Sequence, residues 1–103
     1  MKCEIINSVE ITQSGELLLI LEGGGKASYQ YVYREVSGVY WDNKKGGFHS
    51  NKAPISWSYS DWFTHIVTIV KSIGIELELS PIATWKNISE HAKSEIVNNV
   101  HDR

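Results

Sequence analysis

The segment 58–73 constrains the fold most, because it carries the pattern of a helix with one apolar face. Its large apolar side chains recur at helical spacing on one stripe: Tyr59, Trp62, Phe63, Ile66, Ile69, Val70 and Ile73. Ser58 and Asp61 predict a capping box at the start of this helix, and Gly74 predicts its end. A one-sided helix needs a second layer against which to bury its stripe, so the rest of the chain has to supply that layer.

The first part of the chain supplies the second layer, because its apolar residues alternate with a period of two. Such alternation, interrupted by glycine-containing turns, is typical of strands joined by hairpins. We predict strands at 3–11, 16–22, 27–36 and 39–42. Strand 16–22 carries Leu17, Leu19 and Leu21 on one face and Leu18 and Ile20 on the other. Apolar residues on both faces predict a central strand that is covered on both sides.

The second part of the chain adds a fifth strand and a second helix. Alternation at 75–79 predicts a strand that ends at Pro81, and Asn87 with Glu90 predicts the capped start of a C-terminal helix. Residues 43–56 read as a long connection without an element of its own, a length that is common in functional loops.

These elements predict a single α+β domain over residues 1–103, a length that suits one domain. Its sheet is expected to be a four- or five-stranded, mostly antiparallel β-meander. One amphipathic helix is expected to cross a face of that sheet, and the second helix to follow at the C-terminus. Because one helix covers only part of a sheet face, the apolar Leu18 and Ile20 predict a homodimer formed through the sheet.

Composition argues against a nucleic-acid or membrane partner. The net charge is −2 and the pI is about 6.0, so no global positive field attracts phosphates. The longest apolar run, 17–21, is far shorter than the roughly 20 residues of a membrane-spanning helix. The start of the chain lacks the apolar stretch of a signal peptide, and Cys3 is the single cysteine, so we expect a cytoplasmic protein.

The residues that could carry chemistry do not form a recognisable motif. The histidines lie at 49, 65, 91 and 101, without the spacing of metal ligands, so we expect neither a metal nor a cofactor. Cys3 lies within a strand pattern and is expected to be a small buried residue. Asp42 and His49 could pair as a base and its orienting group, but their spacing alone does not bring them together. We therefore expect no enzymatic activity.

Two surfaces are candidates for binding. Tyr31, Tyr33, Tyr40, Trp41 and Asp42 form an aromatic group suited to a protein interface, although the same side chains also suit a core. The alternative is a loop site for a nucleic acid or small ligand, made by Lys44, Lys45, Phe48, His49 and Lys52. Three lysines on a chain of negative net charge do not by themselves predict nucleic-acid binding.

A family resemblance rests on residues between 16 and 79. They are Tyr31-Val32-Tyr33-Arg34-Glu35, then Tyr40-Trp41-Asp42 before the polar loop, and Gly74-Ile75-x-Leu77 after the helix. In this order the chain resembles a small immunity-protein family of bacterial polymorphic toxin systems, similar proteins of which are carried in mobile integron cassettes. The resemblance implies a non-catalytic protein that binds and neutralises a cognate toxin, or a cassette-borne accessory protein, without a cofactor.

Overall fold

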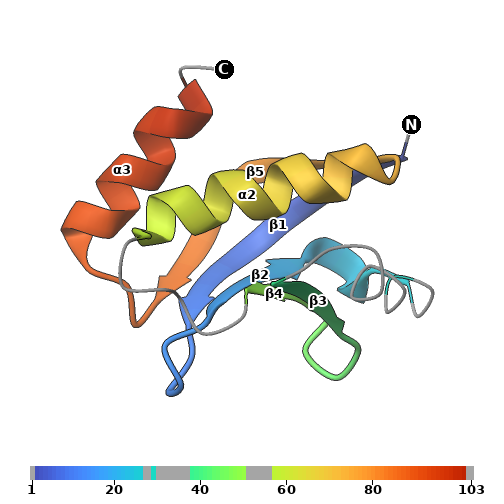
Figure 1. The fold of residues 1–103 in the computed structure, drawn as a ribbon, viewed down its shortest axis with the longest axis horizontal. Coiled ribbons are helices and arrows are strands. Elements are labelled where there is room, and N and C mark those ends of the chain that lie inside the picture. The colour runs from blue at the N-terminus through green and yellow to red at the C-terminus, as the bar shows by residue number, and fades with distance from the viewer. Residues whose placement is uncertain (1, 27–28, 30–37, 51–56, 102–103) are drawn as a thin grey trace.

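The computed structural model describes residues 2–26, 29, 38–50 and 57–101, and these residues form a five-stranded sheet with two α-helices. The elements are β1 (Lys2–Ile11), β2 (Leu17–Leu21), the short 3₁₀ helix η1 (Glu22–Gly24), β3 (Val39–Asp42), β4 (Gly47–Ser50), α2 (Tyr59–Ser72), β5 (Ile75–Lys86) and α3 (Glu90–His101). Helix α2 lies over one face of the sheet, and α3 lies at one end, beside the start of α2 (Figure 1). The predicted α+β class is confirmed.

The sheet has the strand order β3-β4-β2-β1-β5 and is mostly antiparallel. Strand β5 is the exception, because it returns beneath α2 and pairs with β1 in parallel. The order also departs from a simple meander, since β4 lies between β2 and β3. The strand expected at 27–36 lies outside the described residues except for Tyr29, whose backbone N–H donates to the carbonyl of Lys26 at 3.0 Å in a turn.

Helix α2 begins and ends where the sequence predicted. The Ser58 side chain accepts from the backbone N–H of Asp61, and the Asp61 side chain accepts from the N–H of Ser58, which completes the capping box. Gly74 follows the helix at a φ of 94°, a backbone conformation that favours glycine. The apolar stripe of α2 packs against Leu17, Leu19 and Leu21 and their neighbours, so the core lies between α2 and the sheet.

The prediction that residues 43–56 contain no element is wrong, because Gly47–Ser50 form β4. Residues 43–46 make a tight turn in which the N–H of Gly46 donates to the carbonyl of Asp42 at 2.8 Å. Gly47 lets β4 approach β2 closely, since a Cβ at this position would lie 2.5 Å from the backbone oxygen of Leu19. A four-residue strand that begins with a glycine, follows another and contains one large apolar residue carries too short a pattern to be recognised in the sequence.

Two predicted ends in the second part of the chain are also wrong. Pro81 does not end β5, which continues to Lys86 past an irregularity opposite the Ile6–Ser8 stretch of β1. Proline is tolerated there because β5 is an edge strand and the bulge removes the need for its N–H. Helix α3 is capped by Ser89, whose hydroxyl accepts from the N–H of Ala92 at 3.1 Å, whereas the Asn87 side chain donates to the carbonyl of Ile11.

No described helix covers the face of the sheet opposite α2 (Figure 1). Leu18 points to this open face and is nevertheless fully buried, while Ile20 is half-buried. Cys3 is exposed rather than buried, because it lies at the end of β1 opposite Glu76, where no layer covers it. The homodimer stays a prediction, but Leu18 offers it no exposed apolar surface.

Candidate functional site

Strand register places a row of mostly polar residues across the open face. Glu10 of β1 lies opposite Lys86 of β5 and Leu18 of β2, Leu18 lies opposite His49 of β4, and His49 lies opposite Tyr40 of β3. Because side chains alternate along each strand, these five point to the same side of the sheet. The open face therefore brings together polar groups from four of the five strands, with Leu18 of β2 between them.

Asp42 holds His49 in place at the β3 end of this row. The Asp42 Oδ2 atom lies 3.1 Å from His49 Nε2, and its Oδ1 atom accepts the backbone N–H groups of Lys44 and Lys45, each at 3.0 Å. Burial alone would raise the pKa of Asp42, but these hydrogen bonds outweigh it and lower that pKa below its usual value. Asp42 is therefore an ionised acceptor at neutral pH, and Nε2 of His49 carries the proton between them.

Glu16 lies on the other side of the same histidine. Its Oε1 atom is 3.8 Å from His49 Nδ1, and its Oε2 atom accepts the hydroxyl of Tyr40 at 2.8 Å. The Tyr40 ring stacks on the imidazole with ring centres 4.8 Å apart and nearly parallel planes. Burial, with the Glu16 carboxylate second, raises the pKa of Tyr40 to about 12, so the phenol remains a donor.

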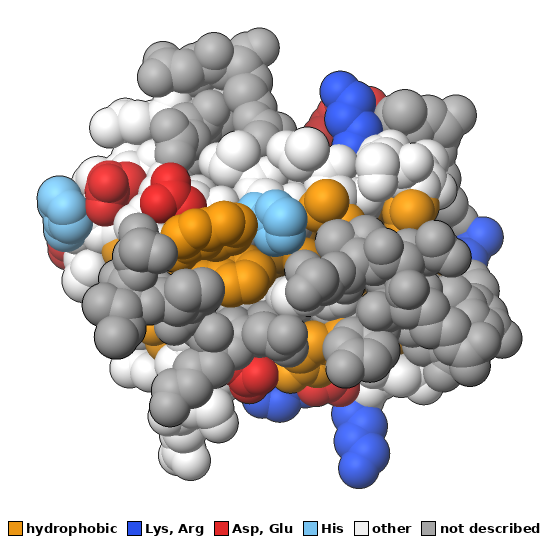
Figure 2. Space-filling model, in the orientation of Figure 1, with side chains coloured by type: hydrophobic (Ala, Val, Ile, Leu, Met, Phe, Trp, Pro, Cys, Tyr) orange, Lys and Arg blue, Asp and Glu red, His pale blue; other side chains and the backbone are white. Residues whose placement is uncertain are grey.

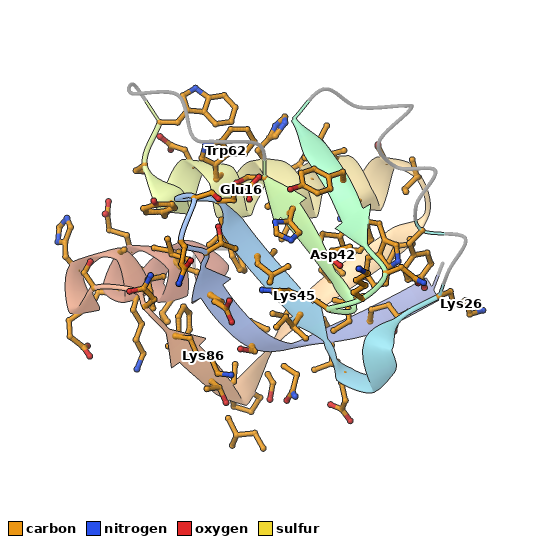
Figure 3. The ribbon with its side chains drawn as sticks, turned by 90° about the horizontal axis from the view of Figure 1, so that it is seen from below. Glu16, Lys26, Asp42, Lys45, Trp62 and Lys86 are labelled. Carbon is orange, nitrogen blue, oxygen red and sulfur yellow. The ribbon has the colours of Figure 1, made fainter. Side chains whose placement is uncertain are left out.

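An open groove of about 780 Å³ runs along this face. It is lined by residues 10–14 and 16, by Lys45 and His49, and by residues 86–87. Lys45 reaches from the β3–β4 turn to within 3.7 Å of the Glu10 carboxylate. Figure 3 views the molecule from below and shows Glu16, Asp42, Lys45 and Lys86 on strands and loops that face the viewer, with α2 behind them. The groove thus offers both carboxylates and ammonium groups to a ligand.

The aromatic group predicted for protein binding is divided by the sheet. Tyr40 and Asp42 lie on the open face, whereas Trp41 is buried on the α2 side, where its ring packs edge-on against Tyr29 and Phe48. The hydroxyl of Tyr29 donates to Glu4, and burial together with that carboxylate raises the pKa of Tyr29. Tyr31 and Tyr33 lie outside the described residues. Of the predicted group, the structure brings only Tyr40 and Asp42 to the site.

The alternative loop site is divided in the same way. Lys44 and Lys45 are exposed in the β3–β4 turn, and His49 is buried on the open face. Phe48 is fully buried in the core between Trp41 and Tyr29, so it presents no surface on which a base could stack. Lys52 lies outside the described residues.

Sequence reasoning missed Glu10, Glu16 and Lys86 as site residues. Glu10 lies near the end of the predicted strand 3–11, Glu16 begins the predicted strand 16–22, and Lys86 lies beyond the predicted strand 75–79. For Glu10 the usable signal was its place in the alternation, because it stands between the apolar Val9 and Ile11. What the sequence could not supply is the strand order that sets them side by side.

A second surface on the α2 side holds aromatic side chains. Trp57 is 39% exposed, and its ring lies 4.8 Å from that of Trp62 and 5.1 Å from that of His65. Figure 2 shows hydrophobic and histidine side chains together on this side.

Among the residues that the structure describes, no group of three or more His, Cys, Asp or Glu side chains is arranged to hold a metal ion. No helix in the described ranges combines the length and apolar character needed to cross a bilayer.

The chain matches no protein-family model, and it matches no curated protein. Among solved structures it is similar to an integron cassette protein, Hfx_Cass5, from the mobile metagenome of the North West Arm sewage outfall. The two chains are 28% identical, the match covers 98% of each, and the TM-score is 0.43.

Proposed function

We propose that this is a non-catalytic binding protein that recognises another protein through the open face of its sheet. The observation that supports this function is the polar network of Tyr40, Asp42, His49 and Glu16 on a face that no described helix covers. Groups held by several hydrogen bonds are already ordered before binding, so a partner loses less entropy in meeting them. A tyrosine beside charged groups is also a common anchor of protein interfaces.

The shape of the groove favours a protein over a small molecule. Small-molecule sites are usually enclosed and mostly apolar. This groove is open, and its lining is dominated by Glu10, Glu16, Lys45 and Lys86 with hydroxyl and amide groups between them. A partner surface with complementary charges can cover such a groove, as the polar parts of protein interfaces do.

The mixed charge of the face argues against nucleic acid as the partner. Lys45 is 3.7 Å from the Glu10 carboxylate, so its charge is partly neutralised within the site. Asp42 and Glu16 lie on either side of His49 and would repel phosphates approaching the centre of the face. The toxin-neutralising role implied by the immunity-family resemblance is the form of protein binding that we propose, without enzymatic activity.

The test uses the protein encoded beside this chain's gene as the partner. Isothermal titration should give a complex whose affinity falls at least tenfold in Tyr40→Ala and is unchanged in the control His91→Ala. His91 suits the control because its side chain is 87% exposed on α3, away from the open face. An affinity that is equal in both variants would place the interface elsewhere, and a neighbour that does not bind at all would contradict the toxin-neutralising role.

The homodimer remains a separate proposal of the same class. The exposed large hydrophobic residues among those described are Trp57, Ile73 and Ile82, and none of them lies in the polar row of the open face. Light scattering at high micromolar concentration should give twice the 11.7 kDa chain mass if the dimer forms. A mass near that of one chain would rule the dimer out.

A further inference from the structure

The strongest unexplained feature of the open face is a buried nitrogen without a hydrogen-bond partner. His49 is 5% exposed, and its Nδ1 atom is one of the buried side-chain atoms that lack a partner among the described residues. Buried polar groups are normally paired, because an unpaired one costs about 1–3 kcal/mol. The imidazole also lines the open groove. Nδ1 itself is closed to solvent, so a group in the groove reaches it only when a neighbouring side chain moves aside.

The atoms around Nδ1 would be stabilised by a hydrogen-bond donor. Asp42 fixes the proton on Nε2, so in the neutral ring Nδ1 is an acceptor with its lone pair free. Glu16 Oε1 lies 3.8 Å from Nδ1 and is an acceptor too. Two acceptors this close repel each other unless a donor lies between or beside them.

We infer that the groove binds a primary ammonium group, supplied by a lysine side chain of the partner protein, between Glu16 Oε1 and His49 Nδ1. An ammonium nitrogen has three N–H donors and forms charge-assisted bonds of about 2.8 Å to acceptors of this kind. One nitrogen can lie at that distance from two atoms that are 3.8 Å apart. Because Nδ1 is closed to solvent, the Glu16 side chain has to move to admit it. The Glu16 side chain is 21% exposed, so the groove reaches it directly.

The other charges of the groove limit which cations fit. Lys45 and Lys86 line the same groove and disfavour a ligand with a second positive charge near them. A single lysine that points toward Glu16 satisfies this restriction, whereas a run of basic residues along the groove does not. Naming the ammonium as a partner's lysine rests on the proposed function, but the site itself can be measured without the partner.

The experiment uses n-butylammonium as the probe and tetramethylammonium as its control. Both carry one positive charge, but only the first has N–H donors. In the full chain with ¹⁵N-labelled histidine, n-butylammonium should shift the Nδ1 resonance of His49 in a saturable manner at neutral pH. Tetramethylammonium at the same ionic strength should not.

Matched variants assign the effect to the proposed acceptors. Glu16→Gln should weaken the binding of n-butylammonium at least tenfold, because the amide loses the charge and can itself donate to Nδ1. Glu76→Gln removes an exposed carboxylate on β5, opposite Cys3 and away from the groove, and should leave the affinity unchanged. Amide spectra of both variants check that the fold is retained.

Three results would overturn the inference. The first is an equal shift with both cations, the second is unchanged binding in Glu16→Gln, and the third is a His49 ring already protonated at both nitrogens at neutral pH. If n-butylammonium binds as described but the neighbouring protein does not, the ammonium site stands and the proposed function fails. If the neighbour binds through Tyr40 but Glu16→Gln has no effect on either ligand, the function stands and this inference fails.

Discussion

The two faces of the sheet differ in what holds their side chains in place. On the α2 side, Phe48 packs against Trp41 and Tyr29, and the hydrophobic effect, which has no preferred direction, stabilises it there. On the open side, its neighbour His49 is also buried but is held by a polar contact to Asp42 and by stacking on Tyr40. Consecutive residues of one strand thus pack into the apolar core on one face and into a polar network on the other.

The two faces of the sheet should respond differently to amino-acid substitution. Apolar packing on the α2 face extends over many side chains, so removing one leaves a cavity that its neighbours fill only in part. The network on the open face consists of a few bonds near solvent, and water can replace some of them. Changes on the α2 face should therefore alter stability most, and changes on the open face should alter binding most.

The largest effect is expected from Phe48→Ala. Truncating a fully buried phenylalanine should lower the free energy of unfolding by about 3–5 kcal/mol, a large share of the stability of a small domain. The adjacent His49→Ala should cost only about 1–2 kcal/mol, because it removes one bond to Asp42 and leaves that carboxylate two backbone N–H donors. Urea unfolding of both variants measures the difference, and equal losses would mean that the two faces do not differ in this way.

A smaller loss is expected from Gly47→Ala, which tests how closely β4 and β2 approach. The added methyl group would lie 2.5 Å from the Leu19 backbone oxygen and 2.9 Å from Leu18 Cδ1, so the strands have to separate. Overpacking of this kind costs about 1–3 kcal/mol. Thermal unfolding of the variant checks the value, and a melting temperature equal to that of the unchanged protein would contradict the close β2–β4 pairing.

The Asp42 network predicts how stability depends on acid. Because hydrogen bonds hold the pKa of Asp42 below its unfolded value of about 3.9, its contribution is present above that pH and is lost as pH falls through the folded pKa. Asp42→Asn should therefore be less stable than the unchanged protein at neutral pH, and the two should converge in acid. The control Glu22→Gln alters an exposed carboxylate and should retain the original acid profile. A constant difference between Asp42→Asn and the unchanged protein at all pH values would contradict this origin.

The sequence predicted the elements whose patterns are long and missed what depends on neighbours far along the chain. The bounds of α2 followed from its stripe and capping box, and β1 and β2 followed from alternation. Strand β4 was missed because four residues with one large apolar side chain carry no usable period. The continuation of β5 past Pro81 depends on its edge position and its parallel pairing with β1, neither of which is local.

The difference between local patterns and distant pairings also explains how much of the site could be predicted. Asp42 and His49 were considered as a pair from the sequence, but only the turn at 43–46 brings their side chains to 3.1 Å. Glu16 joins them because β2 and β4 are neighbours, a pairing that skips β3 in chain order. Trp41 and Tyr40 looked alike in the sequence, and the pleat of β3 sent one into the core and the other to the open face.

The smallest effect on stability is expected at Tyr40. Its dependence on pH distinguishes the polar network of the open face from a hydrogen bond elsewhere. Tyr40→Phe removes the hydrogen bond of 2.8 Å to Glu16, and Tyr59→Phe removes a hydrogen bond of 3.0 Å to the carbonyl of Gly15, each at a cost of about 1 kcal/mol of stability.

The stability of the two variants should differ at alkaline pH. Because the folded pKa of Tyr40 is raised to about 12, its contribution is complete below the unfolded value of about 10 and is lost as pH rises through 12. Stability of the unchanged protein should therefore fall more steeply over this range than that of Tyr40→Phe, while Tyr59→Phe should keep the steeper fall. Ultraviolet titration of the phenolates provides the direct check, since a Tyr40 that ionises near 10 would show that burial and Glu16 do not keep its hydroxyl protonated.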